Sequence, residues 1–422
     1  MKKLSERDKR HLWHPLTQHK LDLERLGIVG AKGAVLYDEN GKEYIDGIAS
    51  WYTTMYGHCN DDIIAAMTAQ MQQLDFVMFS GFTHGPAVEL SEKLMAILPD
   101  KQAKIFFNDN GSTAVEAAIK MALQYYHNKS EKRDTLIAFE GGFHGDTFGA
   151  MSASGLSSYN GPFEDFLLKV ERIPVPQEDT IDDILELLES ICTKNSCAAF
   201  VFEPLVQGAA GMKFHSAKGL DLILKKCQEH HVLCIADEIM TGFGKTGKNF
   251  ACDHLVHQPD IICLSKALTA GMFPLSITSC SQKVFDAFLS DEVSKGFFHA
   301  HTFSAHPLGC AAAIAGLELL VSEEILERRK YIAEAHKQFV SQIENHPKVK
   351  NARSLGVILA VDLDLKTNRY GKLRDRLYQF FMDKGVNLRP LGNTVYVLPP
   401  YVITDEQLQR VYDSIINMLE IV

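Results

Sequence analysis

Residues 260–275 read DIICLSKALTAGMFPL, and the interpretation of the whole chain starts from this stretch. The apolar run 261–264 predicts a short buried strand. Lys266 follows the end of that run, with Gly271 just beyond it. Because an ammonium group without a partner is costly to bury, a lysine at the edge of a core needs a chemical explanation.

The alternation of elements around this strand predicts the fold class. From about residue 60 to residue 310, short apolar runs alternate with longer amphipathic stretches. We expect strands at 104–108, 135–139, 198–203, 232–237, 261–264 and 274–278, and helices at 113–127, 181–193 and 219–230. Continuous apolar strands separated by helices are typical of a mainly parallel sheet covered on both faces, so we predict an α/β fold.

The two ends of the chain differ in pattern from its middle. After residue 310 we expect a long helical stretch at 311–345, a strand within 356–363, paired short strands within 387–398, and a last helix that opens at Thr404 with Gln407 at capping-box spacing. Near the N-terminus, AVLYDENGKEYIDG predicts a hairpin that turns at 39–41. We therefore predict an N-terminal segment, 1–58, that packs with a small α+β domain, 311–422, and a large domain, 59–310.

Two predicted loops carry groups that suit a phosphorylated ring. Ligands of open α/β sheets bind beyond the carboxyl ends of the strands. Gly111 and Ser112 open a helix after strand 104–108, and their amides and hydroxyl suit a phosphate, although taken alone they are better explained as a plain helix cap. After strand 135–139, Phe143 and His144 suit stacking on a flat ring, or alternatively the filling of a tight loop.

Two carboxylates end apolar strands and need partners. Glu203 stands after strand 198–202 and belongs either to a structural ion pair or to a site. Asp237 closes the run VLCIA, with no lysine or arginine adjacent. A protonated pyridine nitrogen would satisfy Asp237, and the carboxylate would keep that nitrogen protonated.

Together these groups match the requirements of pyridoxal 5′-phosphate (PLP). The cofactor needs a phosphate cradle, a carboxylate for its ring nitrogen, an aromatic for its ring face and an amine. Lys266 would form a Schiff base with the aldehyde, because partial burial lowers the pKa of a lysine and supplies a neutral amine. Asp237 and Lys266 lie 29 positions apart, which leaves room for one crossover between neighbouring strands.

A second motif, GFGKTG at residues 242–247, matches G-x-G-x-x-G literally. No long helical pattern follows it, and Pro259 arrives within about a dozen residues, so it is weak evidence for a dinucleotide site. It is not a Walker A loop either, because Ile239 stands where the first glycine belongs.

Composition excludes several other classes of function. The chain has 422 residues and a net charge of -10, without a basic tract, so we expect no nucleic-acid partner. No apolar run approaches the ~18 residues of a membrane span, so we expect no membrane partner. The N-terminus lacks the apolar core of a signal peptide, and the nine cysteines form no C-x-x-C pair, which predicts a cytoplasmic protein with reduced, mostly buried thiols. His144 and His301 lack partners at ligand spacing, so we predict no metal.

The segments ADEIMTGFGKTG and SKALTAGMFP resemble the signature of class III aminotransferases of PLP fold type I, and the resemblance runs through nearly the whole chain. Further motifs resemble the members that act in biotin biosynthesis: HLWHPLTQ, DGIASWYTTMYGH, VMFSGFTH, GGFHGDTFGAMS, EPLVQGAAGM, FACDH and LRPLGNTVYVLPPY. This resemblance implies a PLP-dependent transamination of 8-amino-7-oxononanoate to 7,8-diaminononanoate, with S-adenosylmethionine as the amino donor.

The resemblance also implies roles for individual residues. Lys266 would be the catalytic lysine, and Arg389 would clamp the carboxylate of the keto substrate, a task that suits a guanidinium group. The implied cofactor-binding residues are Gly111, Ser112, Phe143, His144, Glu203, Asp237, Ile239, Lys266 and Thr302, the last reaching the phosphate from the neighbouring subunit of a homodimer. The implied substrate-binding residues are Trp51, Tyr52, Phe143, Lys266, His301 and Arg389.

Two positions depart from the family pattern. Leu16 stands where members often have tyrosine, and Lys245 where they often have arginine, and we expect both changes on the substrate side. They leave open lysine as the donor, or a different class III activity on an ω-amino acid or diamine. An aminomutase and, more distantly, a nicotinamide-dependent dehydrogenase are the alternatives from other classes.

Overall fold

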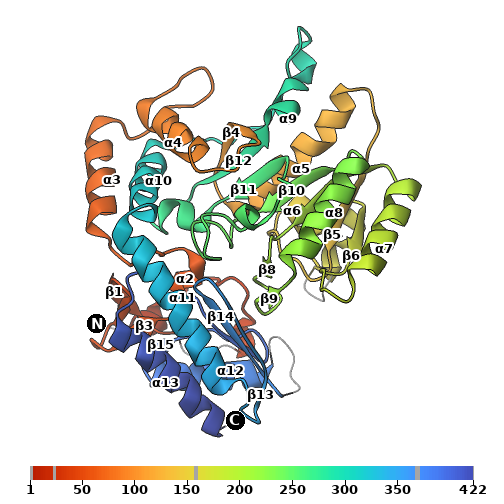
Figure 1. The fold of residues 1–422 in the computed structure, drawn as a ribbon. Coiled ribbons are helices and arrows are strands. Elements are labelled where there is room, and N and C mark those ends of the chain that lie inside the picture. The colour runs from red at the N-terminus through yellow and green to blue at the C-terminus, as the bar shows by residue number, and fades with distance from the viewer. Residues whose placement is uncertain (1–2, 22–24, 156–159, 366–370, 422) are drawn as a thin grey trace.

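The computed structural model of the chain describes residues 3–21, 25–155, 160–365 and 371–421 (Figure 1). Its centre is a seven-stranded sheet in the order β4-β12-β11-β10-β7-β5-β6. The strands are β4 (Gln102–Asn108), β5 (Thr135–Phe139), β6 (Val170–Ile173), β7 (Cys197–Phe202), β10 (Leu233–Asp237), β11 (Ile261–Leu264) and β12 (Ser276–Ser281). Only β12 runs antiparallel to its neighbours within this sheet, so the prediction of a mainly parallel α/β sheet is confirmed.

The reversal of β12 follows from the short connection before it. Only the 3-10 helix η4 (Lys266–Thr269) and a turn separate β11 from β12, whereas a parallel crossover needs a dozen or more residues. The strand expected at 274–278 is present as β12, but it begins at Ser276 and pairs antiparallel with β11.

Helices cover both faces of the sheet, as the continuous apolar strands predicted. Along β11, Ile261 and Cys263 pack into the core on the side of α5, while Ile262 and Leu264 pack into the core on the opposite side, with α8 residues such as Leu220. The helices of this region are α3 (Asp61–Gln73), α4 (Gly85–Met95), α5 (Gly111–Asn128), α6 (Phe148–Ala153), α7 (Ile181–Lys194), α8 (Ala217–Glu229), α9 (Gln282–Asp286) and α10 (Pro307–Leu320). Shorter pieces here are α2 (Ala49–Tyr52), β8 (Val206–Gln207), β9 (Lys213–Phe214), η2 (Gly161–Phe166), η3 (Ala251–His254) and η5 (Val293–Lys295).

The rest of the described chain forms two small sheets with helices beside them, drawn below the large sheet in Figure 1. One sheet has the order β13-β14-β16 and the other the order β1-β2-β3-β15. Their strands are β1 (Ile28–Lys32), β2 (Val35–Asp38), β3 (Glu43–Asp46), β13 (Val349–Leu355), β14 (Ile358–Leu363), β15 (Val386–Asn387) and β16 (Thr394–Val397). The helices of this part are α1 (Leu4–Asp8), η1 (His19–Leu21), α11 (Glu323–Ile343), α12 (Lys372–Asp383) and α13 (Asp405–Ile421).

Two local predictions near the ends of the chain are confirmed. The hairpin 34–47 forms, with β2 and β3 antiparallel. Thr404 and Gln407 make the capping box of α13, since Gln407 N–H donates to Thr404 Oγ1 at 3.2 Å and Thr404 N–H donates to Gln407 Oε1 at 3.0 Å. The division into the three predicted domains stays a prediction, although β3 of the N-terminal segment pairs in parallel with β15 near the C-terminus.

Two other predictions are wrong. The stretch 311–345 is not one helix, because α10 ends at Leu320 and α11 begins at Glu323, with Ser322 as its N-cap. The stretch 387–398 pairs with itself only at the antiparallel bridge between Leu391 and Thr394, whereas β15 pairs with β3 and β16 pairs with β14. Apolar pattern cannot choose between such partners, because each small sheet offers an edge to either strand.

The loop Gly242–Gly247 leads into turns and the 3-10 helix η3, and no long helix follows it, which matches its interpretation as an accidental match. Seven of the cysteines are buried, Cys192 is half-buried and Cys59 is exposed, and all nine are free thiols. Among the described residues, no helix combines the length and apolar character needed to cross a bilayer.

Candidate active site

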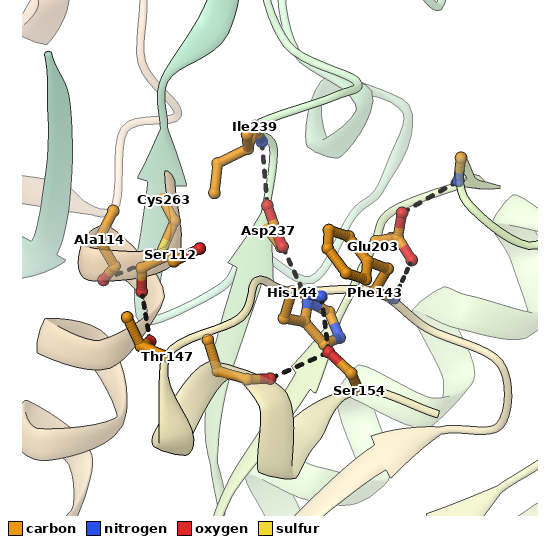
Figure 2. Close-up of polar contacts among 12 residues, drawn as sticks. Ser112, Ala114, Phe143, His144, Thr147, Ser154, Glu203, Asp237, Ile239 and Cys263 are labelled. Atoms are coloured by element: carbon orange, nitrogen blue, oxygen red, sulfur yellow. Dashed lines mark hydrogen bonds and ion pairs between the residues drawn. The ribbon is translucent and has the colours of Figure 1, made fainter. Parts of the chain in front are cut away.

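The carboxyl ends of the central strands bring Asp237 and His144 together. Asp237, the last residue of β10, is buried, and its Oδ2 lies 2.8 Å from His144 Nδ1 (Figure 2). Its Oδ1 accepts the backbone N–H of Ile239 at 3.1 Å. Because a carboxylate only accepts hydrogen bonds, Nδ1 of His144 carries the proton between them.

Only one of the two ring nitrogens of His144 has a hydrogen-bond partner among the described residues. Its backbone N–H donates to Ser154 Oγ at 2.9 Å, which fixes the loop after β5, while its buried Nε2 has no hydrogen-bond partner among the described residues. Burial by itself would lower the pKa of His144, but the hydrogen bond and the negative charge of Asp237 outweigh burial and raise that pKa.

Glu203 holds the same loop from the next strand. Its carboxylate is buried at the end of β7 and accepts the backbone N–H of Phe143 at 3.0 Å and of Gly208 at 3.0 Å. Burial raises the pKa of Glu203 to about 7, His144 opposes that shift, and the charge of Asp237 adds to it. Phe143 remains 44% exposed and lines a cavity of the structure.

Lys266 follows β11, which is the parallel neighbour of β10, so the predicted single crossover from Asp237 is confirmed. Its backbone has φ of 49°, and the Nζ atom lies 5.4 Å from the centre of the Tyr52 ring. Nζ makes no hydrogen bond to any described residue. Burial lowers the pKa of Lys266, while the charges of Asp237 and Glu203 oppose the shift. The result is an amine that loses its proton more readily than an exposed lysine.

The N-terminus of α5 is a capped helix end that also faces the loop after β5. Asn110 and Thr113 form its capping box, which leaves Gly111 and Ser112 in the first turn. Ser112 Oγ accepts the backbone N–H of Asp146 at 3.2 Å. Ile239 packs against Gly111 so closely that a Cβ added there would stand 3.1 Å from the Ile239 side chain. Unpaired amides at a helix N-terminus suit an anion.

Trp51 and Arg389 come from opposite ends of the chain and meet. The Arg389 guanidinium lies 4.9 Å from the centre of the Trp51 ring, a cation–π contact. Trp51 is 40% exposed, whereas Tyr52 is buried and donates its hydroxyl to Tyr396 Oη at 3.2 Å. The predicted substrate residues Trp51, Tyr52, Arg389 and Lys266 are therefore linked through one turn of chain.

Thr302 and His301 lie in a separate turn before α10. Thr302 is exposed. His301 Nε2 lies 3.2 Å from His299 Nε2, and its Nδ1 lies 3.8 Å from Asp109 Oδ2. Within the described chain, neither residue contacts Lys266 or Arg389.

A cavity of about 1580 Å³ opens at Phe143 and Arg389, and Lys266, Asp237 and Trp51 are not among the residues that line it. Phe143, Gly145, Arg389 and Leu16 are among the residues that line it. Lys245 is absent from this lining: it is 0% exposed, and its Nζ donates to Gly242 O at 2.9 Å. Of the two departures from the family pattern, Leu16 therefore lines the cavity, whereas the side chain of Lys245 is buried against its own loop, 242–247.

Sequence reasoning did not anticipate Glu116 and Ser154. Glu116, on α5, accepts the hydroxyl of Thr147 at 2.7 Å and the backbone N–H of Ala150 at 3.1 Å, which ties α5 to the start of α6. Ser154 orients His144 through its backbone, as noted above. Neither residue lies in one of the motifs quoted above. The partners of Glu116 lie more than 30 residues away in the chain, so only the folded structure shows that contact.

The donor set fits the chemistry of a phosphorylated pyridine ring. A carboxylate hydrogen-bonded to a histidine, a helix N-terminus with a hydroxyl, a partly exposed aromatic ring and an amine of lowered pKa lie at the end of one sheet. A metal would need different ligands, and among residues 3–21, 25–155, 160–365 and 371–421 no group of three or more His, Cys, Asp or Glu side chains is placed to hold one.

Comparison with known proteins gives the class of this protein. The family Aminotransferase class-III matches residues 18–419, and the chain belongs to that family. It is 44% identical to the adenosylmethionine-8-amino-7-oxononanoate aminotransferase of Synechococcus elongatus, over 97% of this chain and 98% of the relative. It is 38% identical to the protein of the same name from Geobacter sulfurreducens, over 98% of this chain and 96% of the relative.

Solved structures agree with that assignment. The adenosylmethionine-8-amino-7-oxononanoate aminotransferase of Methanocaldococcus jannaschii superposes with a TM-score of 0.92 at 31% identity, covering 99% of this chain and 98% of that one. The omega transaminase of Pseudomonas jessenii, solved in complex with PMP, superposes with a TM-score of 0.91 at 27% identity, with the same coverage. The expected PLP fold type I is thereby confirmed.

The raised pKa of Glu203 gives a pH-dependent prediction. The pKa of Glu203 is about 7 when folded against a reference of 4.5, so the folded protein binds more protons between these values. The stabilisation from this group is complete below 4.5 and is lost as the pH rises through about 7. The stability lost on Glu203→Gln should therefore be smaller at about pH 8 than at about pH 5.5, measured as Tm by calorimetry. Glu334→Gln, on the exposed side of α11, is the control, and an E203Q difference that is constant with pH would contradict the prediction.

Proposed function

We propose that this protein binds pyridoxal 5′-phosphate and transfers an amino group to 8-amino-7-oxononanoate, giving 7,8-diaminononanoate for biotin biosynthesis, with S-adenosylmethionine as the donor. The observation that carries the proposal is the meeting of Lys266, the Asp237–His144 pair and the Arg389–Trp51 pair around one strand end and its neighbouring turn. The substrates are inferred from the names of relatives up to 44% identical over nearly the full chain.

In this proposal the cofactor is held from four directions. Gly111 and Ser112 would bind its phosphate at the start of α5, and Asp237, oriented by His144, would accept a hydrogen bond from the protonated ring nitrogen. Phe143 would cover one ring face and Ile239 would line the cradle, with Glu203 fixing the loop that carries Phe143. When bound, the cofactor supplies an electron-withdrawing ring that accepts the charge left when a proton leaves the donor carbon.

Lys266 is the group that moves protons. Because burial lowers the pKa of its amine, Nζ can take a proton from the donor carbon and return it elsewhere as a general acid. Asp237, negatively charged and buried beside His144, stabilises positive charge where the ring nitrogen would lie. His144 keeps the carboxylate in place through Nδ1, since the ring cannot rotate without losing the 2.8 Å contact.

The substrate side uses the other pair. Arg389 would bind the carboxylate of 8-amino-7-oxononanoate through its guanidinium, and Trp51 would hold that guanidinium by stacking. Tyr52 and His301 complete the proposed substrate set, while the aromatic surface of Trp51 and Phe143 suits the positive sulfonium of the donor.

We also propose a homodimer with shared active sites, in which the exposed Thr302 reaches the phosphate bound by the other subunit. Exposed apolar side chains support such an interface, among them Met78, Phe82, Phe298 and Phe303. The free, mostly buried thiols suit a reducing compartment, so we place the protein in the cytoplasm.

A second candidate is supported by the cavity. Leu16 lines it where related proteins often have tyrosine, and several structural neighbours at 26–27% identity are omega transaminases. An ω-amino acid or diamine aminotransferase, or the same reaction with lysine as donor, is therefore the alternative.

The donor assay separates these candidates. With 8-amino-7-oxononanoate as acceptor, S-adenosylmethionine should yield 7,8-diaminononanoate and lysine should not, with product followed by mass spectrometry. If only lysine yields product, lysine is the donor and S-adenosylmethionine is not. If neither donor yields product but an ω-amino acid and a keto acid are turned over, the proposed reaction is wrong and the alternative activity takes its place.

Replacing Lys266 tests the amine. Lys266→Ala should lower turnover by at least about a thousandfold while leaving the Tm nearly unchanged, because the general base and acid is lost. Borohydride treatment of the wild-type protein should place a pyridoxyl tag on the peptide that contains Lys266. Lys248→Ala, an exposed lysine, is the matched control. A tag on another peptide, or an active K266A variant, would disprove the assignment.

Replacing Arg389 tests the clamp. Arg389→Ala should raise KM for 8-amino-7-oxononanoate by about 10- to 100-fold, since a charged partner of the substrate carboxylate is lost. Arg376→Ala, an exposed arginine on α12, should leave KM unchanged. An unchanged KM for R389A would show that another group binds the carboxylate.

A further inference from the structure

The turn that carries Trp51 has an unusual backbone. Ala49, Ser50, Trp51 and Tyr52 have φ of 46°, 43°, 70° and 69°, so four consecutive non-glycine residues are left-handed. L-residues rarely adopt this conformation even singly, so it persists only where the surroundings impose it. A specific set of contacts must therefore hold this turn.

Asp46 provides those contacts. It ends β3 with 0% exposure, and its Oδ2 accepts Ser50 Oγ–H at 2.8 Å, inside the left-handed turn. The same oxygen lies 2.8 Å from His58 Nε2, just beyond the turn. Its Oδ1 accepts Ile48 N–H at 3.4 Å, before the turn. The Asp46 carboxylate thus contacts Ile48 before the turn, Ser50 within it and His58 after it.

The fourth partner of Asp46 lies near the other end of the chain. Asn387 Nδ2 donates to Asp46 Oδ1 at 3.1 Å, and the two residues are register partners in the parallel pair β3–β15. Arg389 is two residues beyond Asn387. Asp46 therefore contacts both segments that meet in the Trp51–Arg389 stack, one through Ser50 and one through Asn387.

We propose that Asp46 is a positioning residue for the substrate side of the site, because it fixes the left-handed turn and strand β15 relative to each other and so sets the stack of Trp51 on Arg389. The proposal rests on the proposed function only for the role of Arg389 as a substrate clamp. Tyr52 has an anchor of its own in Tyr396, so Asp46 acts mainly on substrate binding and less on the amine of Lys266.

Trp51 is itself a reporter of this geometry. The chain has two tryptophans, and the other, Trp13, is 90% exposed, so Trp13→Phe leaves Trp51 as the single tryptophan. The test compares D46N and S50A in the W13F holoenzyme, with R389A as the reference for a lost stack. Asp221→Asn is the matched control, because Asp221 also accepts from a histidine, His257 Nδ1 at 2.9 Å, but on α8.

D46N should raise acrylamide quenching of Trp51 toward the value of R389A and raise KM for 8-amino-7-oxononanoate about tenfold, with kcat within about twofold, because charged hydrogen bonds at the turn are lost. S50A, which keeps the carboxylate, should show the same pattern at about threefold in KM. D221N should change neither quantity, although it lowers the Tm.

Two results overturn the proposal. One is a folded D46N with the Trp51 quenching and KM of the W13F parent. The other, decisive if D46N does not fold, is an S50A variant with unchanged quenching and KM. If the W13F parent does not accept 8-amino-7-oxononanoate, the proposed function fails, and the quenching of Trp51 alone still decides whether Asp46 sets the stack.

Discussion

The hydrogen bond between Asp237 and His144 is the interaction on which the site depends. A buried carboxylate at the end of a parallel strand is tolerable only with a proton donor or cation beside it, and His144 supplies one from the loop after β5. That loop is held in turn by Glu203 and Ser154. Because β10, β7 and β5 are neighbours, one edge of the sheet collects the charged groups, and Lys266 joins them from β11.

Charge balance at this edge explains the pKa pattern. Burial pushes the pKa of Glu203 up and that of Lys266 down, so each is biased toward its neutral form, while the charge of Asp237 keeps the pKa of His144 raised. Lys266 therefore gives up its proton more readily than an ordinary lysine, while Glu203 keeps its proton to a higher pH than an ordinary glutamate. The first turn of α5, which contains Gly111 and Ser112, reaches the same loop, because Ser112 Oγ accepts the backbone N–H of Asp146.

The pair Trp51 and Arg389, which we propose binds the substrate, depends on a different set of contacts. Two chain segments separated by more than three hundred residues meet through the pairing of β3 with β15, and a left-handed turn places Trp51 on Arg389. The residues proposed to hold the cofactor stand on the large sheet, and the pair proposed to bind the substrate stands beside a small one. Leu16 lines the cavity together with Phe143 and Arg389, and Asp237 is not part of that lining, so a change at Leu16 would leave the contacts of Asp237 in place.

Local pattern was enough to predict the α/β class, most strands of the large sheet to within three residues, and the grouping of Asp237 and Lys266 on neighbouring parallel strands, because apolar runs and strand ends are encoded locally. The roles of Phe143 and Ser112 rest on the family resemblance and stay predictions. The errors of the sequence-based prediction were of another kind: one helix was expected where Ser322 starts a second, and β15 and β16 were paired with each other. Only the tertiary structure decided the partners of short strands, the burial of Lys245 and the network around Asp46. These depend on contacts between segments far apart in the chain, and no periodicity within either segment records them.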